Sequence, residues 1–126
     1  MEKTEVRQDA FNAAKMVYIV IHYELGNEEM LPGLCKRTRN YLEKKGPLNK
    51  TEKLLLDFFS GTIVKITPGT RGKDKVKAFM EFKKELEIVT SDPFEKKIMH
   101  YFDFIAWAES KIEQRPFAKT IKEGTR

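Results

Sequence analysis

A chain of 126 residues, of which 40% are hydrophobic, has the size of one domain and enough apolar side chains to form a core, which excludes a disordered chain. A single cysteine excludes a disulfide framework and a structural zinc site built from several thiolates. The net charge of +5 is concentrated in residues 36–77, where twelve basic side chains outnumber four acidic ones.

The first predicted helix covers Glu5 to Leu25, and Gly26 is expected to end it. One apolar stripe along this helix consists of Phe11, Ala14, Tyr18, Ile21 and Leu25. A second stripe on the other side consists of Met16, Ile19, Val20 and Tyr23. A helix that is apolar on two sides is normally held between other elements. We therefore expect the first stripe to face the core and the second to contact a partner.

The second predicted helix covers Glu28 to Lys45, because acidic residues suit its first turn and Gly46 with Pro47 follows its last. Its expected buried stripe contains Met30, Leu31, Leu34, Cys35, Thr38, Tyr41 and Leu42. The third helix is expected to begin at Asn49, which can form a capping box with Glu52. Its apolar residues are Leu54, Leu55, Phe58, Phe59, Thr62, Ile63 and Ile66. A short strand over 62–67 is the alternative, which we reject because no second strand is available to pair with it.

The fourth predicted helix covers Asp74 to Val89 and has one charged face. Its apolar residues are Val76, Phe79, Met80, Phe82, Leu86 and Val89. The fifth is expected to run without a break over 93–113, because Asp92 can cap it and Glu95 lies three residues after that cap. Its expected core stripe contains Phe94, Ile98, Tyr101, Phe102, Ile105, Ala108 and Ile112.

A short last helix is expected over Phe117–Lys122. The connections are short and contain no Gly- or Ser-rich linker, so residues 1–126 are predicted to form a single all-α domain of five long antiparallel helices plus the short C-terminal one. No apolar run is long enough to span a membrane, and residues 1–9 do not have the pattern of a signal peptide. We therefore expect a soluble, cytoplasmic protein without a membrane partner.

Several short runs suggest a relationship to helical-repeat proteins. The first two helices share with such repeats Ala14, Tyr18, the turn 24–27, and the small or apolar positions Leu34 and Cys35. On these residues the pair resembles a tetratricopeptide-type hairpin, although the signature Trp and the closing Pro are missing. The runs 22–27, 92–97 and 101–107 also resemble the C-terminal segment of large uncharacterised bacterial proteins built from tetratricopeptide-like helices. The resemblance implies an irregular helical-repeat bundle that caps a longer solenoid.

A second stripe on the predicted fifth helix points to an interaction surface. It contains His100, Phe104, Trp107 and Lys111. Aromatic residues on a solvated face suit a binding hot spot, unless residues 117–122 fold back and cover them. Together with the second stripe of the first helix, this pattern predicts a non-enzymatic interaction or scaffold module. It would bind another protein, its own parent chain or a second copy.

The alternative function is nucleic-acid binding by the basic stretch 36–77. The candidate anion-binding residues are Lys36, Arg37, Arg39, Arg71 and Lys73. The loop before the fourth helix departs from the phosphate-binding loop pattern at Thr67 and Asp74, so we interpret it as a flexible basic connection.

No residues point to an enzyme, a metal ion or a cofactor. His22 and His100 each stand alone on a helix, and Cys35 lies in an apolar stripe where a buried, unreactive thiol is expected. Asp103 lies among aromatic residues, where it could be buried with a raised pKa or lie on the outer face near Lys96. None of these residues forms a set that supports catalysis.

Overall fold

The computed structural model describes residues 3–66 and 72–113, which are all-α and contain no strand. The elements in chain order are α1 (Lys3–Glu24), η1 (Glu28–Met30), α2 (Leu31–Glu43), α3 (Lys50–Asp57), η2 (Phe58–Thr62), α4 (Gly72–Val89), η3 (Glu95–His100) and α5 (Phe104–Glu113). The predicted fold class is therefore confirmed. The last predicted helix, Phe117–Lys122, lies outside the described residues.

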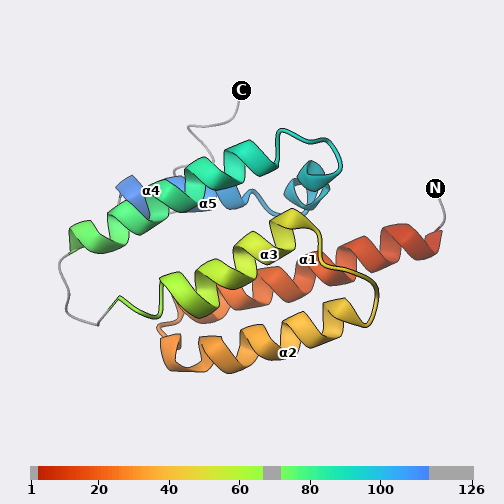
Figure 1. The fold of residues 1–126 in the computed structure, drawn as a ribbon, viewed down its shortest axis with the longest axis horizontal. Helices are drawn as coiled ribbons and strands as arrows, with labels where there is room; N and C mark the ends of the chain where they lie inside the picture. Colours follow the sequence, from red (N-terminus) through yellow and green to blue (C-terminus); the bar gives the residue numbers. More distant parts are fainter. Residues whose placement is uncertain (1–2, 67–71, 114–126) are drawn as a thin grey trace.

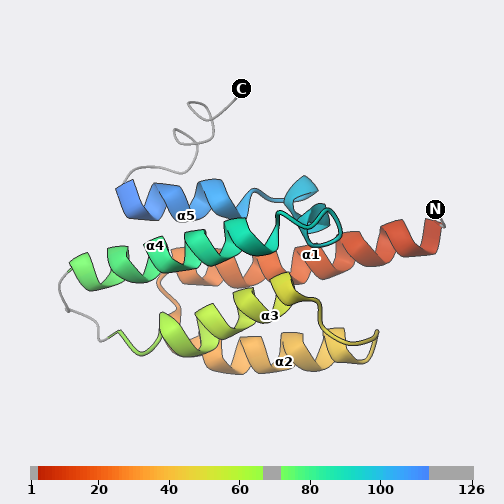
Figure 2. The ribbon, with the colours of Figure 1, turned by 45° about the horizontal axis from the view of Figure 1, so that its top comes forward.

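The helices pack as two groups that α3 connects (Figures 1 and 2). α1 and α2 form an antiparallel hairpin, and α4 and α5 lie side by side as a second antiparallel pair. α3 contacts α4, and its continuation η2 contacts α2. Membership of a helical-repeat family stays a prediction.

Two helix ends form as the sequence predicts. Gly26 adopts a φ of 82°, a conformation that L side chains disfavour, and the Asn27 N–H donates to the His22 carbonyl at 3.0 Å. At the start of α3, the Glu52 N–H donates to Asn49 Oδ1 at 2.7 Å and the Asn49 N–H donates to Glu52 Oε1 at 3.1 Å. The C-terminal stop of α1 and the capping box of α3 are both confirmed.

Helix α3 continues into a wider turn, η2, which is π-helical. The Ile63 N–H donates to the Phe58 carbonyl five residues earlier, at 2.9 Å. The adjacent side chains Phe58 and Phe59 are both buried, and their ring centroids lie 5.3 Å apart. The wide turn thus delivers two consecutive aromatic rings to the core, as π-bulges in helices allow.

The centre of the core is a cluster of aromatic rings from α1, η2, α4 and α5. The Trp107 ring centroid lies 5.9 Å from that of Tyr23, 5.6 Å from that of Phe59 and 5.3 Å from that of Phe79. Most of these contacts are edge-to-face, a favoured geometry worth about 0.5–1.5 kcal/mol per pair beyond the buried area. The cluster therefore holds together four elements that are distant in the sequence.

The prediction of one continuous helix over 93–113 is wrong. Residues 95–100 form the 3-10 helix η3, and Tyr101 to Asp103 separate it from α5. Asp103 is exposed, and its Oδ1 accepts the Ala106 N–H at 2.9 Å, so this carboxylate caps α5. The break changes which residues face inward: Phe94 and Tyr101 are exposed, although both were expected in the core stripe.

Candidate interaction surface

The stripe of α1 that was expected to contact a partner lies in the core instead. Met16, Ile19 and Val20 are buried, and the half-buried Tyr23 packs its ring on Phe59, Phe79 and Trp107. The expectation that this stripe is free for a partner is therefore wrong. Both stripes of α1 are apolar, but this one is buried because its Tyr23 ring contacts the aromatic cluster.

The aromatic stripe expected on the fifth helix is also internal. Phe104 and Trp107 are fully buried, because the break at Tyr101–Asp103 turns this side of α5 toward α1 and α4. His100 belongs to η3 rather than to α5, and it is exposed. The predicted stripe of His100, Phe104, Trp107 and Lys111 therefore does not exist as one surface, and this prediction is wrong.

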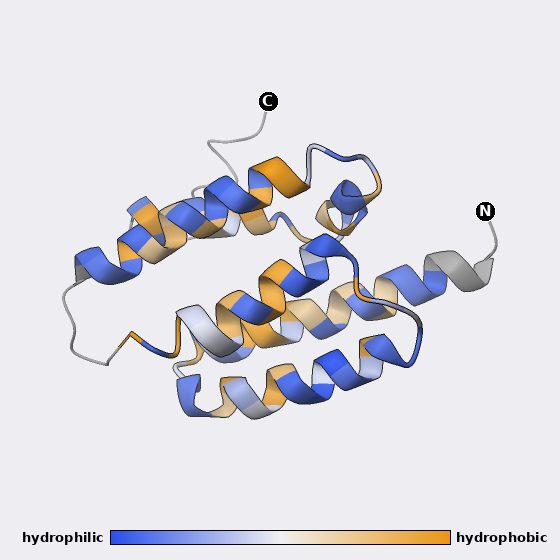
Figure 3. Cartoon of the chain, viewed as in Figure 1, coloured by the Kyte–Doolittle hydropathy of each residue, from blue (hydrophilic) through white to orange (hydrophobic). Residues whose placement is uncertain are grey.

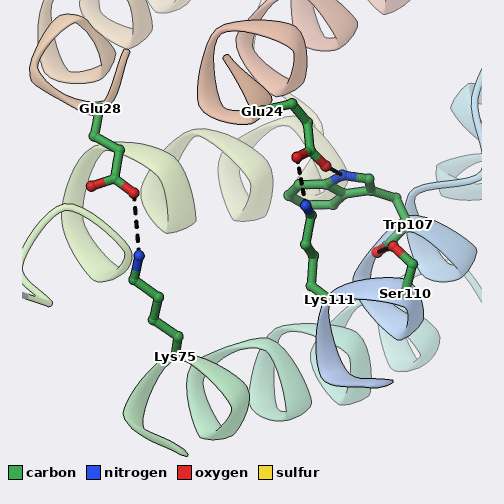
Figure 4. Close-up of polar contacts among 6 residues, drawn as sticks. All are labelled: Glu24, Glu28, Lys75, Trp107, Ser110 and Lys111. Atoms are coloured by element: carbon green, nitrogen blue, oxygen red, sulfur yellow. Dashed lines mark hydrogen bonds and ion pairs between the residues drawn. The ribbon is translucent and has the colours of Figure 1, made fainter. Parts of the chain in front are cut away.

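Glu24, the last residue of α1, contacts two polar groups of α5, the Trp107 indole N–H and the Lys111 ammonium group (Figure 4). Its Oε1 accepts the Trp107 indole N–H at 2.6 Å, and its Oε2 lies 2.5 Å from Lys111 Nζ. A second ion pair joins Lys75 Nζ of α4 to Glu28 of η1 at 3.4 Å (Figure 4). These contacts fasten the end of the α1–α2 hairpin to α4 and α5, so they have a structural role.

Four of the exposed large apolar side chains lie together on the outer face of α1; the others, Met30, Met80, Ile88, Phe94 and Tyr101, lie on other elements. Phe11 is 55% exposed, Tyr18 50%, Ile21 47% and Leu25 67%. With the exposed Ala14 they repeat at the spacing of a single helix face, opposite the buried Met16 and Ile19. We call these five residues (Phe11, Ala14, Tyr18, Ile21 and Leu25) the outer face of α1. The sequence predicts correctly that these residues share one helix face, but the expectation that this face lies in the core is wrong.

The candidate anion-binding residues are dispersed. Lys36 and Arg37 are exposed on α2, which Figure 3 draws mainly in hydrophilic colours on the side shown. Arg39 is engaged, because its guanidinium lies 2.9 Å from the Asp57 carboxylate. Lys73 is exposed in the first turn of α4, and Arg71 lies outside the described residues. Of the described candidates, Lys36, Arg37 and Lys73 are therefore the ones that can contribute to a free cationic surface.

A polar cluster that sequence reasoning missed surrounds the N-terminus of α3. The buried Glu95 carboxylate accepts the Thr51 N–H and the Thr51 hydroxyl, each at 2.9 Å, and the Lys50 N–H at 3.2 Å. Glu52 is buried beside it, and burial is the main cause that raises the pKa of its carboxyl above 4.5, with the negative charges of Glu95 and Asp9 adding to the effect.

These acidic residues line a pocket of about 70 Å³, which also touches Asn12 and Tyr101. Within the described part of the chain, no three His, Cys, Asp or Glu side chains are grouped as metal ligands would be. Both carboxylate oxygens of Glu95 accept N–H groups from the first turn of α3. Glu95 is therefore part of the packing between α3 and η3. The signal for this contact is weak in the sequence, because Glu95 and Thr51 are distant along the chain.

Cys35 is buried, as the sequence predicts, and burial raises the pKa of its thiol to about 11.

The chain matches no family model, no curated protein and no solved structure. Within residues 3–66 and 72–113, no helix combines the length and the hydropathy needed to cross a bilayer. The outer face of α1 is the candidate interaction surface of the described residues.

Proposed function

We propose that this chain is a non-enzymatic interaction module that binds an apolar helix through the outer face of α1. The observation that carries the proposal is the set of four large apolar side chains, 47–67% exposed, on one face of a 22-residue helix. The opposite face of the same helix forms the core. The resemblance to helical-repeat proteins supports the proposal, because such hairpins pack on neighbouring helices through their outer faces.

The dimensions of the outer face suit a helix as the bound element. Phe11 and Leu25 lie about 21 Å apart along the axis at 1.5 Å per residue, and the face is one stripe wide. Each half-exposed side chain leaves about 100 Å² uncovered, so the four together expose about 400 Å². A contiguous apolar patch of this size on a monomer is frequently functional.

The exposed area also indicates the strength of binding. About 400 Å² is half of the roughly 800 Å² that each partner buries in a standard stable interface, so we expect weak binding. We therefore expect a reversible complex rather than a permanent one.

Photo-crosslinking from the outer face tests this proposal. A benzophenone side chain at position 18, at the centre of the face, is expected to crosslink to an amphipathic helix. The same group at the exposed position 40 on α2 is the matched control and is not expected to do so. The proposal fails if position 18 yields no crosslink, or if the mapped partner segment is polar and is captured equally from position 40.

The basic side of α2 supports a second candidate function, binding of nucleic acid. Lys36 and Arg37 are both exposed, and neither forms an ion pair within the described part of the chain. Binding to duplex DNA would fall steeply between about 50 and 200 mM salt, and replacing both residues by Gln would reduce the salt slope by about 2. An absence of binding at the lower salt concentration would eliminate this candidate.

A further inference from the structure

We propose that the pocket between α1, α3 and η3 binds a primary alkylammonium group, the group that ends a lysine side chain. The pocket has a volume of about 70 Å³ and lies where the start of α3 and η3 meet α1 (Figures 1 and 2). It shares no residue with the outer face of α1, so the inference does not depend on the proposed function. Three observations support it: a buried oxygen without a partner, an excess of negative charge, and two exposed aromatic rings.

One carboxyl oxygen that lines the pocket is buried without a partner. Glu52 is 7% exposed, and its Oε1 accepts the Asn49 N–H of the capping box at 3.1 Å. Within the described part of the chain, no hydrogen bond or ion pair reaches its Oε2. Buried polar atoms in folded proteins normally have a partner, because leaving one unpaired is costly. A bound group with N–H donors would supply the partner that Oε2 lacks.

The charged side chains that line the pocket are mostly acidic, although the chain as a whole is basic. Asp9 of α1, Glu52 of α3 and Glu95 of η3 lie around it, together with one cation, Lys97. Glu95 is paired through both oxygens, whereas the half-buried Asp9 forms no ion pair within the described residues. A cation bound between Asp9 and Glu52 would therefore meet two carboxyl groups that still have free acceptor positions.

Two exposed aromatic rings line the same pocket. Phe94 is 57% exposed and Tyr101 is 44% exposed. The Lys97 Nζ lies 5.0 Å from the centroid of the Phe94 ring, a distance at which the ring attracts a cation. In the described part of the chain Lys97 forms no ion pair with the acidic residues of the pocket. Its ammonium group therefore shows that a cation is accepted at this ring, while it leaves the carboxyl groups free.

The size and the hydrogen-bond donors of a primary ammonium group suit this pocket. A volume of about 70 Å³ holds about five water-sized groups, since one water needs about 10–15 Å³. A primary ammonium group and the carbons next to it are of that size, and its N–H groups all donate hydrogen bonds. A quaternary ammonium group has no N–H donor for the oxygen of Glu52. A metal ion fits less well, because the described acidic side chains are not grouped as metal ligands would be.

Titration of the isotope-labelled full chain with n-butylammonium, followed by NMR, tests the proposal. The amide signals of Asn49 and Phe94 are expected to shift until they saturate, with a dissociation constant of about 1–10 mM for so small a ligand. n-Butanol lacks the charge and tetramethylammonium lacks the N–H donors, so each is expected to bind at least about fivefold more weakly. The absence of a saturable shift up to about 100 mM n-butylammonium, or equal binding of n-butanol, overturns the proposal.

A pair of matched variants locates the binding site. Asp9→Asn removes one carboxylate of the pocket and is expected to weaken the binding of n-butylammonium about tenfold. Glu87→Gln removes one negative charge from an exposed position on α4 that does not line the pocket, and it is expected to change the dissociation constant less than about twofold. Equal effects of the two variants would mean that the cation is attracted by the general charge of the protein, and the pocket would be rejected.

A variant with stronger binding keeps the test valid if Asp9→Asn disturbs the fold. Lys97→Gln removes the competing ammonium group from an exposed position, so it is expected to strengthen the binding of n-butylammonium about threefold. Binding that is unchanged or weaker in Lys97→Gln contradicts the proposed position of the cation beside Phe94.

A lysine that is blocked at both ends distinguishes the two sources of such a group. If acetyl-lysine methylamide, acetylated at its α-amino group, binds as well as n-butylammonium, the pocket accepts a lysine side chain of a partner protein. If it fails to bind while n-butylammonium binds, the pocket accepts a small free amine. Both results support the ammonium site, and the failure of both ligands overturns it without affecting the proposed function of the outer face of α1.

Discussion

Replacement of Glu95 by Ala is expected to destabilise the fold by about 2–4 kcal/mol, and the amount follows from what the carboxylate contacts. The Thr51 N–H is buried and donates to Glu95 Oε1 at 2.9 Å, so it loses its acceptor in the variant. A hydrogen bond to a charged group contributes about 1.5–3 kcal/mol. The negative charge at the N-terminus of α3 adds about 0.3–1 kcal/mol.

The other two contacts of Glu95 add little to this loss. Lys50 is exposed, so its N–H can donate to water instead. The Thr51 hydroxyl lies 3.1 Å from the Glu95 carbonyl oxygen, which remains in the variant. Glu95→Gln keeps one acceptor oxygen for Thr51, but it loses the charge and replaces the oxygen that accepts the Lys50 N–H by an NH2 group, so it is expected to cost about 1 kcal/mol, less than the Ala variant.

Urea denaturation followed by the fluorescence of Trp107 measures these losses. With a slope of about 1–3 kcal/mol per molar urea, Glu95→Ala is expected to lower the midpoint by about 1 M or more, and Glu95→Gln by about half as much. Glu87→Ala, at an exposed position on α4, is the control and is expected to change stability by less than about 0.5 kcal/mol. If Glu95→Ala costs no more than this control, the reasoning about the buried carboxylate is refuted.

Three further predictions concern buried groups. Trp107→Phe and Glu24→Ala are expected to be coupled by about 1 kcal/mol in a double-mutant cycle, because the indole N–H donates to the partly exposed Glu24 at 2.6 Å; additive losses would contradict the contact. The thiol of Cys35, with a pKa raised to about 11, is expected to resist Ellman's reagent at about pH 8 until urea unfolds the chain, and rapid labelling of the native protein would show that it is accessible. The raised pKa of Glu52 means that the folded state holds its proton more tightly than the unfolded state, so stability falls as the pH rises from about 4.5 through the folded pKa. Glu52→Gln is expected to lessen that fall in urea midpoints measured across the pH range, and an unchanged profile would rule out this role for Glu52.

The sequence predicts those features that depend on local signals. The capping box at Asn49, the stop at Gly26 and the course of α4 all follow from residues within a few positions of one another, and the structure contains all three. The burial of α1 is different, because its two apolar stripes have similar composition. The choice between them depends on Phe59, Phe79 and Trp107, which meet Tyr23 only after the chain has folded.

The break before α5 has a local signal in the sequence, but a second, earlier signal favours one longer helix. Asp103 directly precedes an apolar run and has the pattern of a helix cap. Asp92 and Pro93 form an equally good signal for the start of a helix. A single helix from there to residue 113 would place most of the apolar residues on regular faces. In the structure the Asp92 carboxylate accepts the Phe94 N–H at 2.9 Å, forming a local turn rather than the start of a long helix. The error at this one point also misplaced Phe104 and Trp107.

The wide turn η2 holds one residue more than an ordinary α-helical turn. If Ser60 were deleted, the Ile63 N–H and the Phe58 carbonyl would be four residues apart, and the same bond would close as an α-helical one. Ile63, now fully buried, would therefore keep its place in the interior. Loss of one residue from α3 itself has no such outlet, because every later side chain would rotate by about 100° about the helix axis.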